Sequence, residues 1–217
     1  MIRVGLIDGA LPPGWPGLHR QSLFCKADGI PLAQRHAEAM ARTIRFHAGD
    51  VAFQNAVIFP GRLATSMDGV CAAMEWLAEE PPEIVLCAFG MARCPVALAV
   101  ATSRLQQAGC LIVGSAPARG GTAYPAACDH VFSVQGDARC APQEVSRLDL
   151  PHATFGACPE AVGEADIRGA SPAAAHLAGL LAKSVQAAGR SVQQGVDDFV
   201  RFRGREQRGR AAGAILA

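Results

Sequence analysis

The chain has 217 residues, of which 50% are hydrophobic and 18% are charged. This composition is typical of a folded globular protein and excludes general disorder, because enough apolar surface can be buried to offset the ordering entropy. The formal net charge of +1 gives no overall attraction for nucleic acid. Apolar runs also fall short of the roughly 18 residues that a membrane span needs. We therefore expect neither a nucleic-acid-binding protein nor a membrane protein.

Predicted strands and helices alternate along the chain. In order, the pattern predicts a strand over residues 2–8, a helix over 31–47, a strand over 51–59, a helix over 66–79, a strand over 83–89, a helix over 95–108, strands over 110–113 and 130–134, and a helix over 173–181. Nearly continuous apolar strands separated by such helices are typical of βαβ units. We therefore expect an α/β fold, a doubly wound and mostly parallel sheet with helices on both faces.

Two segments lie outside this alternation. We expect irregular structure over residues 136–169. The segment after residue 190 is rich in arginine. We therefore assign residues 1–190 to one α/β domain and residues 191–217 to a C-terminal extension. Two interpretations of this extension are open. It is either a solvated or frayed terminus, or a basic segment that binds an acidic peptide or partner protein. Five of its arginines fall within ten residues: Arg201, Arg203, Arg205, Arg208 and Arg210.

The start of the sequence bears on cellular location, and the cysteines bear on whether a metal is bound. The strand over residues 2–8 begins directly after Met1, without the basic head, apolar run and cleavage site of a secretory signal, so we expect a cytoplasmic protein. The eight cysteines show neither CxxC pairs nor the clustered Cys and His spacing of zinc sites. Several lie in apolar runs, which predicts buried free thiols, and we expect no metal and no other cofactor.

Three polar residues stand at predicted strand ends or helix starts, where an open parallel sheet exposes side chains to ligands. Singly, Asp8 is explained as a turn residue, His36 as a packed histidine, and Ser171 before a proline as a helix N-cap. Together they are a candidate triad, because a serine hydroxyl becomes a nucleophile only with a base and an orienting carboxylate. The order Asp, His, Ser is that of subtilisin.

The residues around this candidate triad resemble the subtilisin-like serine protease family. Residues 4–9 resemble the strand that delivers the aspartate, and residues 36–41 resemble the segment His-Gly-Thr-x-Val-Ala without its glycine. Residues 169–179 resemble Gly-Thr-Ser-x-Ala-x-Pro-His-Val-Ala-Gly, and this match is the most specific, because the serine, the histidine and both glycines keep register. The resemblance implies the family's fold and a peptide-bond hydrolase that uses the three triad residues.

Two weaker segments extend the resemblance from residue 2 to about residue 185. Ala88, Phe89 and Gly90 fall where the family has Ser-Leu-Gly, the edge that pairs with an extended substrate. Residues 124–134 resemble the stretch that follows the family's oxyanion loop. The resemblance therefore implies that the tripeptide at residues 88–90 binds substrate.

The sequence departs from the family at the oxyanion hole. Members place an asparagine after the strand that corresponds to residues 110–114, whereas an ungapped count puts Ala118 in that place. Loss of such a donor costs roughly 2.7–4 kcal/mol, about 10²–10³ in turnover. Ser115 and Arg119 are the candidate replacements, and the backbone N–H of Ser171 is a further donor.

These features together predict a slow, dedicated processing enzyme. The chain starts at its first strand without room for a pro-domain, and its loops are short. It resembles compact subtilisin-like maturation proteases, including those that remove the leader of the quinohemoprotein amine dehydrogenase small subunit. The expected partner is a peptide or small-protein substrate, together with other maturation enzymes, and the expected reaction is a single leader-removing cut.

Three alternatives stay open. A catalytically impaired peptide-binding or escort protein is favoured by the oxyanion change and opposed by the retained triad residues. A flavodoxin-like or nucleotide-binding domain explains the βαβ pattern, but residues 8–14 fit neither GxGxxG nor GxxxxGK[ST]. A cysteine nucleophile, Cys140 or Cys158, lacks a local signature.

Overall fold

The computed structural model describes residues 1–25, 34–119, 121–186 and 196–205. Within this part of the chain, nine strands form one sheet in the order β11-β7-β8-β6-β5-β4-β1-β3-β2. All neighbouring strands are parallel except β7 and β8. The strands are β1 (Ile2–Asp8), β2 (Leu18–Leu23), β3 (Val51–Val57), β4 (Ile84–Cys87), β5 (Leu111–Ser115), β6 (Phe132–Gly136), β7 (Val145–Leu150), β8 (Ala153–Ala157) and β11 (Val200–Arg203).

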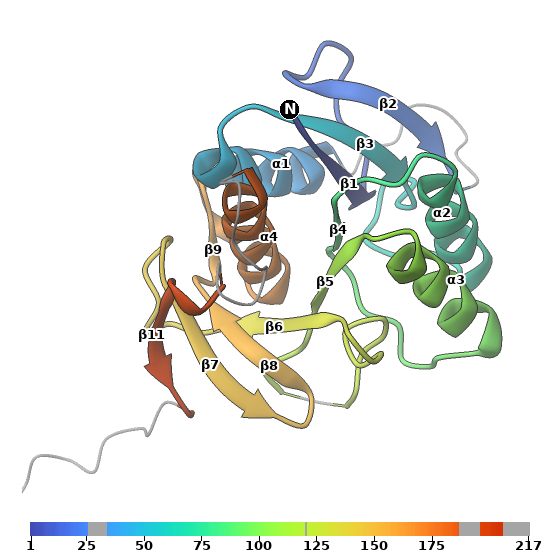
Figure 1. Cartoon of the computed structure of the whole chain (residues 1–217). Coiled ribbons are helices and arrows are strands. Elements are labelled where there is room, and N and C mark those ends of the chain that lie inside the picture. The colour runs from blue at the N-terminus through green and yellow to red at the C-terminus, as the bar shows by residue number, and fades with distance from the viewer. Residues whose placement is uncertain (26–33, 120, 187–195, 206–217) are drawn as a thin grey trace, which may run out of the picture.

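Helices cover both faces of the sheet (Figure 1). On one face, α1 (Gln34–Ala48) and α4 (Ala170–Gln186) lie side by side, and on the other face α2 (Met67–Glu79) pairs with α3 (Val96–Gln107). Each pair closes a separate hydrophobic core against the sheet. The expected doubly wound α/β fold is therefore confirmed.

The central strands and α4 are buried for reasons that the sequence makes plain. Strand β4 is apolar throughout and fully buried, as a parallel strand covered on both faces requires. Helix α4 consists mainly of alanine and leucine, and every residue from Pro172 to Ala182 is buried. Small side chains let this helix approach its neighbour closely: a Cβ on Gly179 would lie 2.8 Å from the carbonyl oxygen of Ile44 in α1.

The region expected to be irregular, residues 136–169, is instead mostly β-structure. It holds β7, β8 and a separate two-stranded sheet of β9 (Glu160–Ala161) and β10 (Glu164–Arg168). These strands are short, and β7 and β8 form the antiparallel side of the main sheet, so they lack the long apolar runs of the central strands. Strand β2 was also not expected, because it is a half-exposed edge strand of mixed polarity.

The ends of two expected helices and the C-terminal segment also differ in detail. Helix α4 begins at Ala170, so Ser171 lies in its first turn and is not an N-cap before it. Residues 31–33, with which the first helix was expected to begin, lie outside the described residues. Strand β11, which carries Arg201 and Arg203, pairs with β7 at the edge of the main sheet. Arg205 follows this strand and lines a separate cavity, whereas Arg208 and Arg210 lie outside the described residues.

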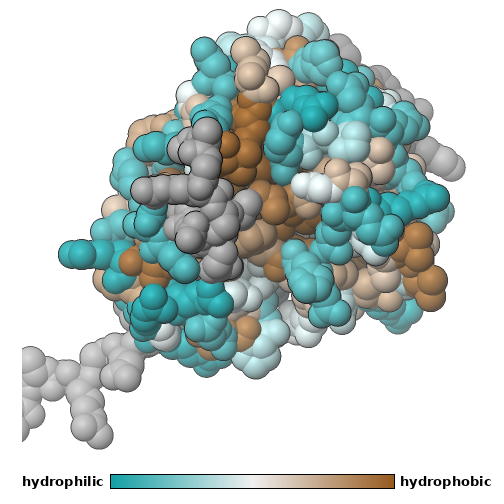
Figure 2. All heavy atoms as spheres, in the orientation of Figure 1, coloured by the Kyte–Doolittle hydropathy of each residue, from teal (hydrophilic) through white to brown (hydrophobic). Residues whose placement is uncertain are grey.

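The surface of the molecule is mixed in polarity. On the face shown in Figure 2, hydrophobic residues gather in a central band with hydrophilic residues on either side. None of the helices in the described part of the chain combines the length and the apolar content that a membrane crossing requires.

Candidate active site

Asp8 and His36 form a hydrogen-bonded pair at the carboxyl end of β1. Asp8 is fully buried, and both of its carboxylate oxygens lie 2.8 Å from Nδ1 of His36. One of these oxygens also accepts the backbone N–H of Gly9 at 2.7 Å. Because an ionised carboxylate only accepts hydrogen bonds, the Nδ1 atom of His36 carries the proton and its Nε2 atom is the acceptor nitrogen. This is the tautomer that a general base for a serine hydroxyl requires.

The environment of His36 makes its imidazole more basic. Burial opposes the charged form, but the hydrogen bond and the negative charge of Asp8 together outweigh it and raise the pKa of His36 above its ordinary value. The carboxylate therefore both orients the ring and stabilises the imidazolium that forms when the ring takes a proton.

Asn55 fixes the backbone that follows Asp8. It is fully buried in β3, next to β1, and its Oδ1 accepts the N–H of Leu11 at 2.9 Å. Its Nδ2 donates to the carbonyl oxygens of Leu6 and Gly9, each at 3.1 Å. Sequence reasoning missed this residue, although a polar side chain inside an apolar strand was a usable signal, because a buried amide needs partners.

Ser171 lies in the first turn of α4 and shares a cleft with His36. The cleft has a volume of about 320 Å³ and contains the whole tripeptide that was expected to bind substrate. In this structure the Ser171 hydroxyl donates to the carbonyl oxygen of Ala88 at 3.0 Å, and not to His36. The cleft is lined by His36, Phe59, Leu63, Ala64, Thr65, Ala88, Phe89, Gly90, Met91 and Ser171.

The two side-chain candidates for the oxyanion hole lie outside this cleft. Ser115, at the end of β5, is buried and donates its hydroxyl to the carbonyl oxygen of Cys87 at 3.2 Å. Arg119 is exposed, and Ala118 lines a separate cavity. The backbone N–H of Ser171 belongs to the first turn of α4, where amides have no acceptor within the helix, so it is available as a donor beside the Ser171 hydroxyl.

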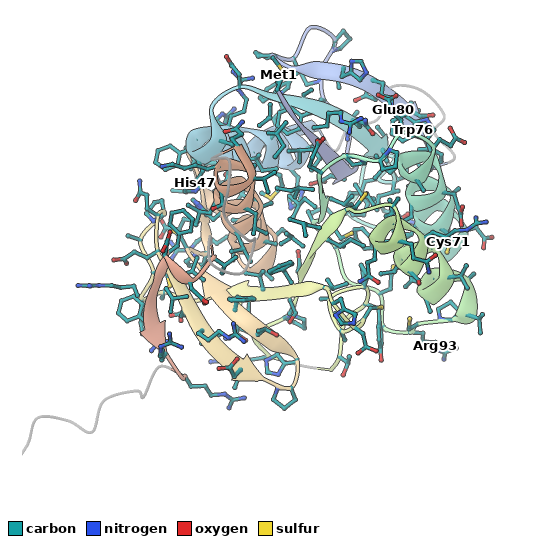
Figure 3. The ribbon with its side chains drawn as sticks, viewed as in Figure 1. Met1, His47, Cys71, Trp76, Glu80 and Arg93 are labelled. Carbon is teal, nitrogen blue, oxygen red and sulfur yellow. The ribbon has the colours of Figure 1, made fainter. Side chains whose placement is uncertain are left out.

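His176, the histidine of the resembling segment, has a structural position. It is fully buried in α4, and its Nε2 lies 2.8 Å from the carbonyl oxygen of Glu160. Its Nδ1 lies 2.8 Å from Nε2 of His47, a residue of α1 that Figure 3 labels. The pair therefore joins the two helices that carry His36 and Ser171, and it does not line the cleft.

The two cysteines considered as nucleophiles are poor candidates by position. Cys140 and Cys158 are buried and lie outside the cleft. Burial raises the pKa of the Cys140 thiol to about 12 and also raises that of Cys158, so neither is a ready thiolate. All eight cysteines are free, but only half of them are buried, so the expectation that most are buried holds for Cys87, Cys110, Cys140 and Cys158 alone. Among the described residues, no group of His, Cys, Asp and Glu could hold a metal ion.

Similarity to known proteins is found at the level of structure only. No protein-family model matches the sequence, and no curated protein matches it. The fold is that of subtilisin-like serine proteases. A cold-adapted subtilisin-like serine proteinase is similar over 90% of this chain and 80% of its own, with 18% identity and a TM-score of 0.67.

Two further similar structures are peptide-processing enzymes by their descriptions. A lanthipeptide protease is similar over 90% of this chain and 78% of its own, with 18% identity and a TM-score of 0.65. The prenylagaramide maturation protease PagA is similar over 85% of this chain and 75% of its own, with 13% identity and a TM-score of 0.62.

Proposed function

We propose that the protein is a serine endopeptidase in which Asp8, His36 and Ser171 form the catalytic triad. The observation that carries the proposal is that His36, hydrogen-bonded to the buried Asp8, and Ser171 line the same cleft although they are far apart in sequence. Similarity of the fold to subtilisin-like proteases supports it. The described residues offer no metal cluster that would support a metallopeptidase instead.

The mechanism begins with a change of partner for the serine hydroxyl. Ser171 releases the carbonyl oxygen of Ala88 and donates to Nε2 of His36, which takes the proton as the oxygen attacks the peptide carbonyl. The backbone N–H of Ser171 donates to the oxyanion. The imidazolium, stabilised by Asp8, then protonates the leaving amine, and water hydrolyses the acyl-enzyme by the reverse sequence.

Substrate binds as an extended strand between two backbone segments of the cleft. Residues 63–65 and residues 88–90 both line the cleft, and an extended peptide bound there would hydrogen-bond to main chain while its side chains alternate between pockets. Leu63 and Met91 make part of this lining apolar. We propose that Ala88, Phe89 and Gly90 are the substrate-binding edge.

The biological reaction is a dedicated maturation cut that removes a leader from a peptide or small subunit. Two proteins of similar fold are described as a lanthipeptide protease and a maturation protease, which supports this narrower proposal. The oxyanion hole supports it too, because without the family's asparagine turnover is expected to fall by about 10²–10³. A slow enzyme suits one cut in one partner better than general proteolysis. Ser115 and Arg119 remain candidate oxyanion donors only if their side chains move into the cleft.

A peptide-binding escort that has lost activity is the second candidate function. The observation in its favour is that the Ser171 hydroxyl is hydrogen-bonded to Ala88 instead of His36. Such a protein would hold an extended peptide against residues 88–90 without attacking it. The two candidates differ in whether His36 activates the serine.

A serine-directed fluorophosphonate separates the two, because it reacts covalently only with an activated serine. The endopeptidase is expected to be labelled once, at Ser171, and to lose labelling in Ser171→Ala and His36→Ala. Ser184→Ala is the matched control, because Ser184 lies on the same helix and only donates to the carbonyl of Leu180. Absence of label on folded wild-type protein would reject the endopeptidase in favour of the escort.

A further inference from the structure

Two half-buried cysteines outside the triad face each other at close range. The Sγ atoms of Cys94 and Cys128 are 3.8 Å apart, and both thiols are free. Cys94 lies in the loop between β4 and α3, and Cys128 lies between β5 and β6. Figure 3 labels Arg93, the neighbour of Cys94, at the lower right of the molecule beside α3. The proposed mechanism uses neither cysteine.

The backbones that carry the two cysteines are already fixed to each other. The N–H of Met91 donates to the carbonyl of Tyr124 at 2.8 Å, and the N–H of Tyr124 donates to the carbonyl of Met91 at 2.9 Å. Beyond this antiparallel bridge, the N–H of Cys128 donates to the carbonyl of Pro125 at 2.9 Å. The sulfur atoms therefore meet across two segments that hydrogen bonds hold together, and a disulfide would bring them from 3.8 Å to about 2.05 Å.

We propose that Cys94 and Cys128 are a modification site, a dithiol that small-molecule disulfides such as oxidised glutathione convert reversibly into an intramolecular disulfide. One cysteine thiolate attacks a sulfur of the oxidant, forms a mixed disulfide and releases one glutathione thiolate, which is protonated. The second cysteine then attacks the protein sulfur of the mixed disulfide and releases the second glutathione. The protein loses two protons and two electrons, and the oxidant gains them as two thiols.

The surroundings of Cys94 and Cys128 affect how fast the thiols react and which other thiol could react with them. Burial, together with the adjacent Cys94, raises the pKa of the Cys128 thiol to about 11, so the exchange accelerates as pH rises through the alkaline range. Cys71 on α2 also interacts electrostatically with Cys94, and it is the alternative partner that an experiment must exclude. Figure 3 shows Cys71 on the same side of the molecule as Arg93.

The disulfide would fix part of the cleft lining to the segment that precedes β6. Met91 lines the cleft and lies three positions before Cys94, so the cross-link would hold the edge formed by residues 88–91 against residues 124–128. A covalent bond here would also link the connection between β4 and α3 to the connection between β5 and β6, which lowers the entropy of the unfolded state. The inference goes beyond the proposed peptidase activity and does not depend on it.

Peptide mapping of the oxidised protein tests the proposal. The reduced, folded full chain is incubated with oxidised glutathione, residual thiols are alkylated, and intact and digested protein are weighed. Before alkylation, the main intact product should be lighter than the reduced protein by two hydrogen atoms and carry no glutathione. After alkylation and digestion, it should yield linked peptides that contain Cys94 and Cys128. Dithiothreitol should restore the reduced mass, and the oxidised form should unfold at a temperature higher by roughly 8 °C.

Two variants decide which thiols are involved. Cys128→Ser should stop at a single stable glutathione on Cys94, whereas the matched control Cys71→Ser should form the same disulfide as wild type. The proposal is overturned by stable glutathione adducts in place of the disulfide, by a link from Cys94 to Cys71, or by an unchanged mass loss in Cys128→Ser. If Cys128→Ser does not fold, Cys94→Ser replaces it, and the wild-type map alone still identifies the linked residues. These readouts are masses of cysteine peptides, so they are separate from fluorophosphonate labelling of Ser171.

Discussion

Replacing His47 by glutamine should remove much of the protein's sensitivity to mild acid. The carbonyl of Glu160 only accepts, so Nε2 of His176 carries a proton and the Nδ1 atom of neutral His176 is an acceptor. His47 then donates its Nε2–H to that acceptor. Protonation of His176 would place two donors face to face, and protonation of His47 would add a buried charge near Lys183. Both changes disfavour the folded state.

The magnitude follows from the two pKa values of His47. Burial, the neighbouring His176 and the charge of Lys183 lower the pKa of His47 from 6.5 to about 3. The unfolded chain therefore binds more protons than the folded chain below about pH 6.5, and stability falls as pH falls. Between about pH 7 and pH 5 this one group removes roughly 2 kcal/mol from the free energy of unfolding. The pKa of His176 is also lowered, by burial, and acts in the same direction.

Urea unfolding at several pH values between 7 and 5 measures the effect. His47→Gln keeps an N–H donor for His176 but does not titrate, so its free energy of unfolding should fall less by about 2 kcal/mol over this range. The raised pKa of His36 and the carboxyl groups contribute equally to both proteins and cancel in the difference. Identical slopes for wild type and His47→Gln would refute this account of the pair.

The remaining predictions concern the triad, its support and the sheet edge. Labelling of Ser171 should rise with pH to a midpoint above 6.5, because the pKa of His36 is raised, and Asp8→Asn should lower the rate by roughly 10⁴-fold; a labelling rate independent of pH would argue against His36 as the base. Asn55→Ala should lower the free energy of unfolding by about 1–3 kcal/mol and slow labelling, since the backbone after Asp8 loses partners; urea unfolding together with labelling kinetics checks this, and wild-type values for both would count against it. Removal of residues 200–217 should lower the unfolding temperature, because β7 loses its parallel neighbour, while substrate affinity stays unchanged; weaker substrate binding by a folded truncated chain would instead indicate that the basic segment is a handle for the substrate.

The sequence predicted the fold best where an apolar strand or helix also carries a candidate site residue at its end. The apolar runs of β1, β4 and β5 and the alanine-rich start of α4 predicted the central sheet and the positions of Asp8 and Ser171. The antiparallel hairpin of β7 and β8 was missed, because short strands at one side of a sheet carry a weak pattern.

The oxyanion donor could not be predicted from residue types. Ser115 has a suitable side chain, but its place on β5 turns the hydroxyl to Cys87 and away from the cleft. A backbone N–H donor, such as that of Ser171, cannot be recognised from residue type, because every residue except proline has one. The hydrogen bonds made by Asn55 were similarly hidden, because they depend on the register Leu6 to Asn55 between β1 and β3.

The close approach of α4 to α1 ties the spacing between His36 and Ser171 to a contact with the main chain. His36 stands near the start of one helix and Ser171 near the start of the other, and the two helices touch further along at Gly179 and Ile44. A methyl group at position 179 would contact the backbone carbonyl oxygen of Ile44. This oxygen cannot move without the backbone of α1, unlike the end of a flexible side chain. An added methyl group would push the two helices apart and so change the spacing between His36 and Ser171. Substitutions at the surface would leave this contact, and therefore the spacing, unchanged.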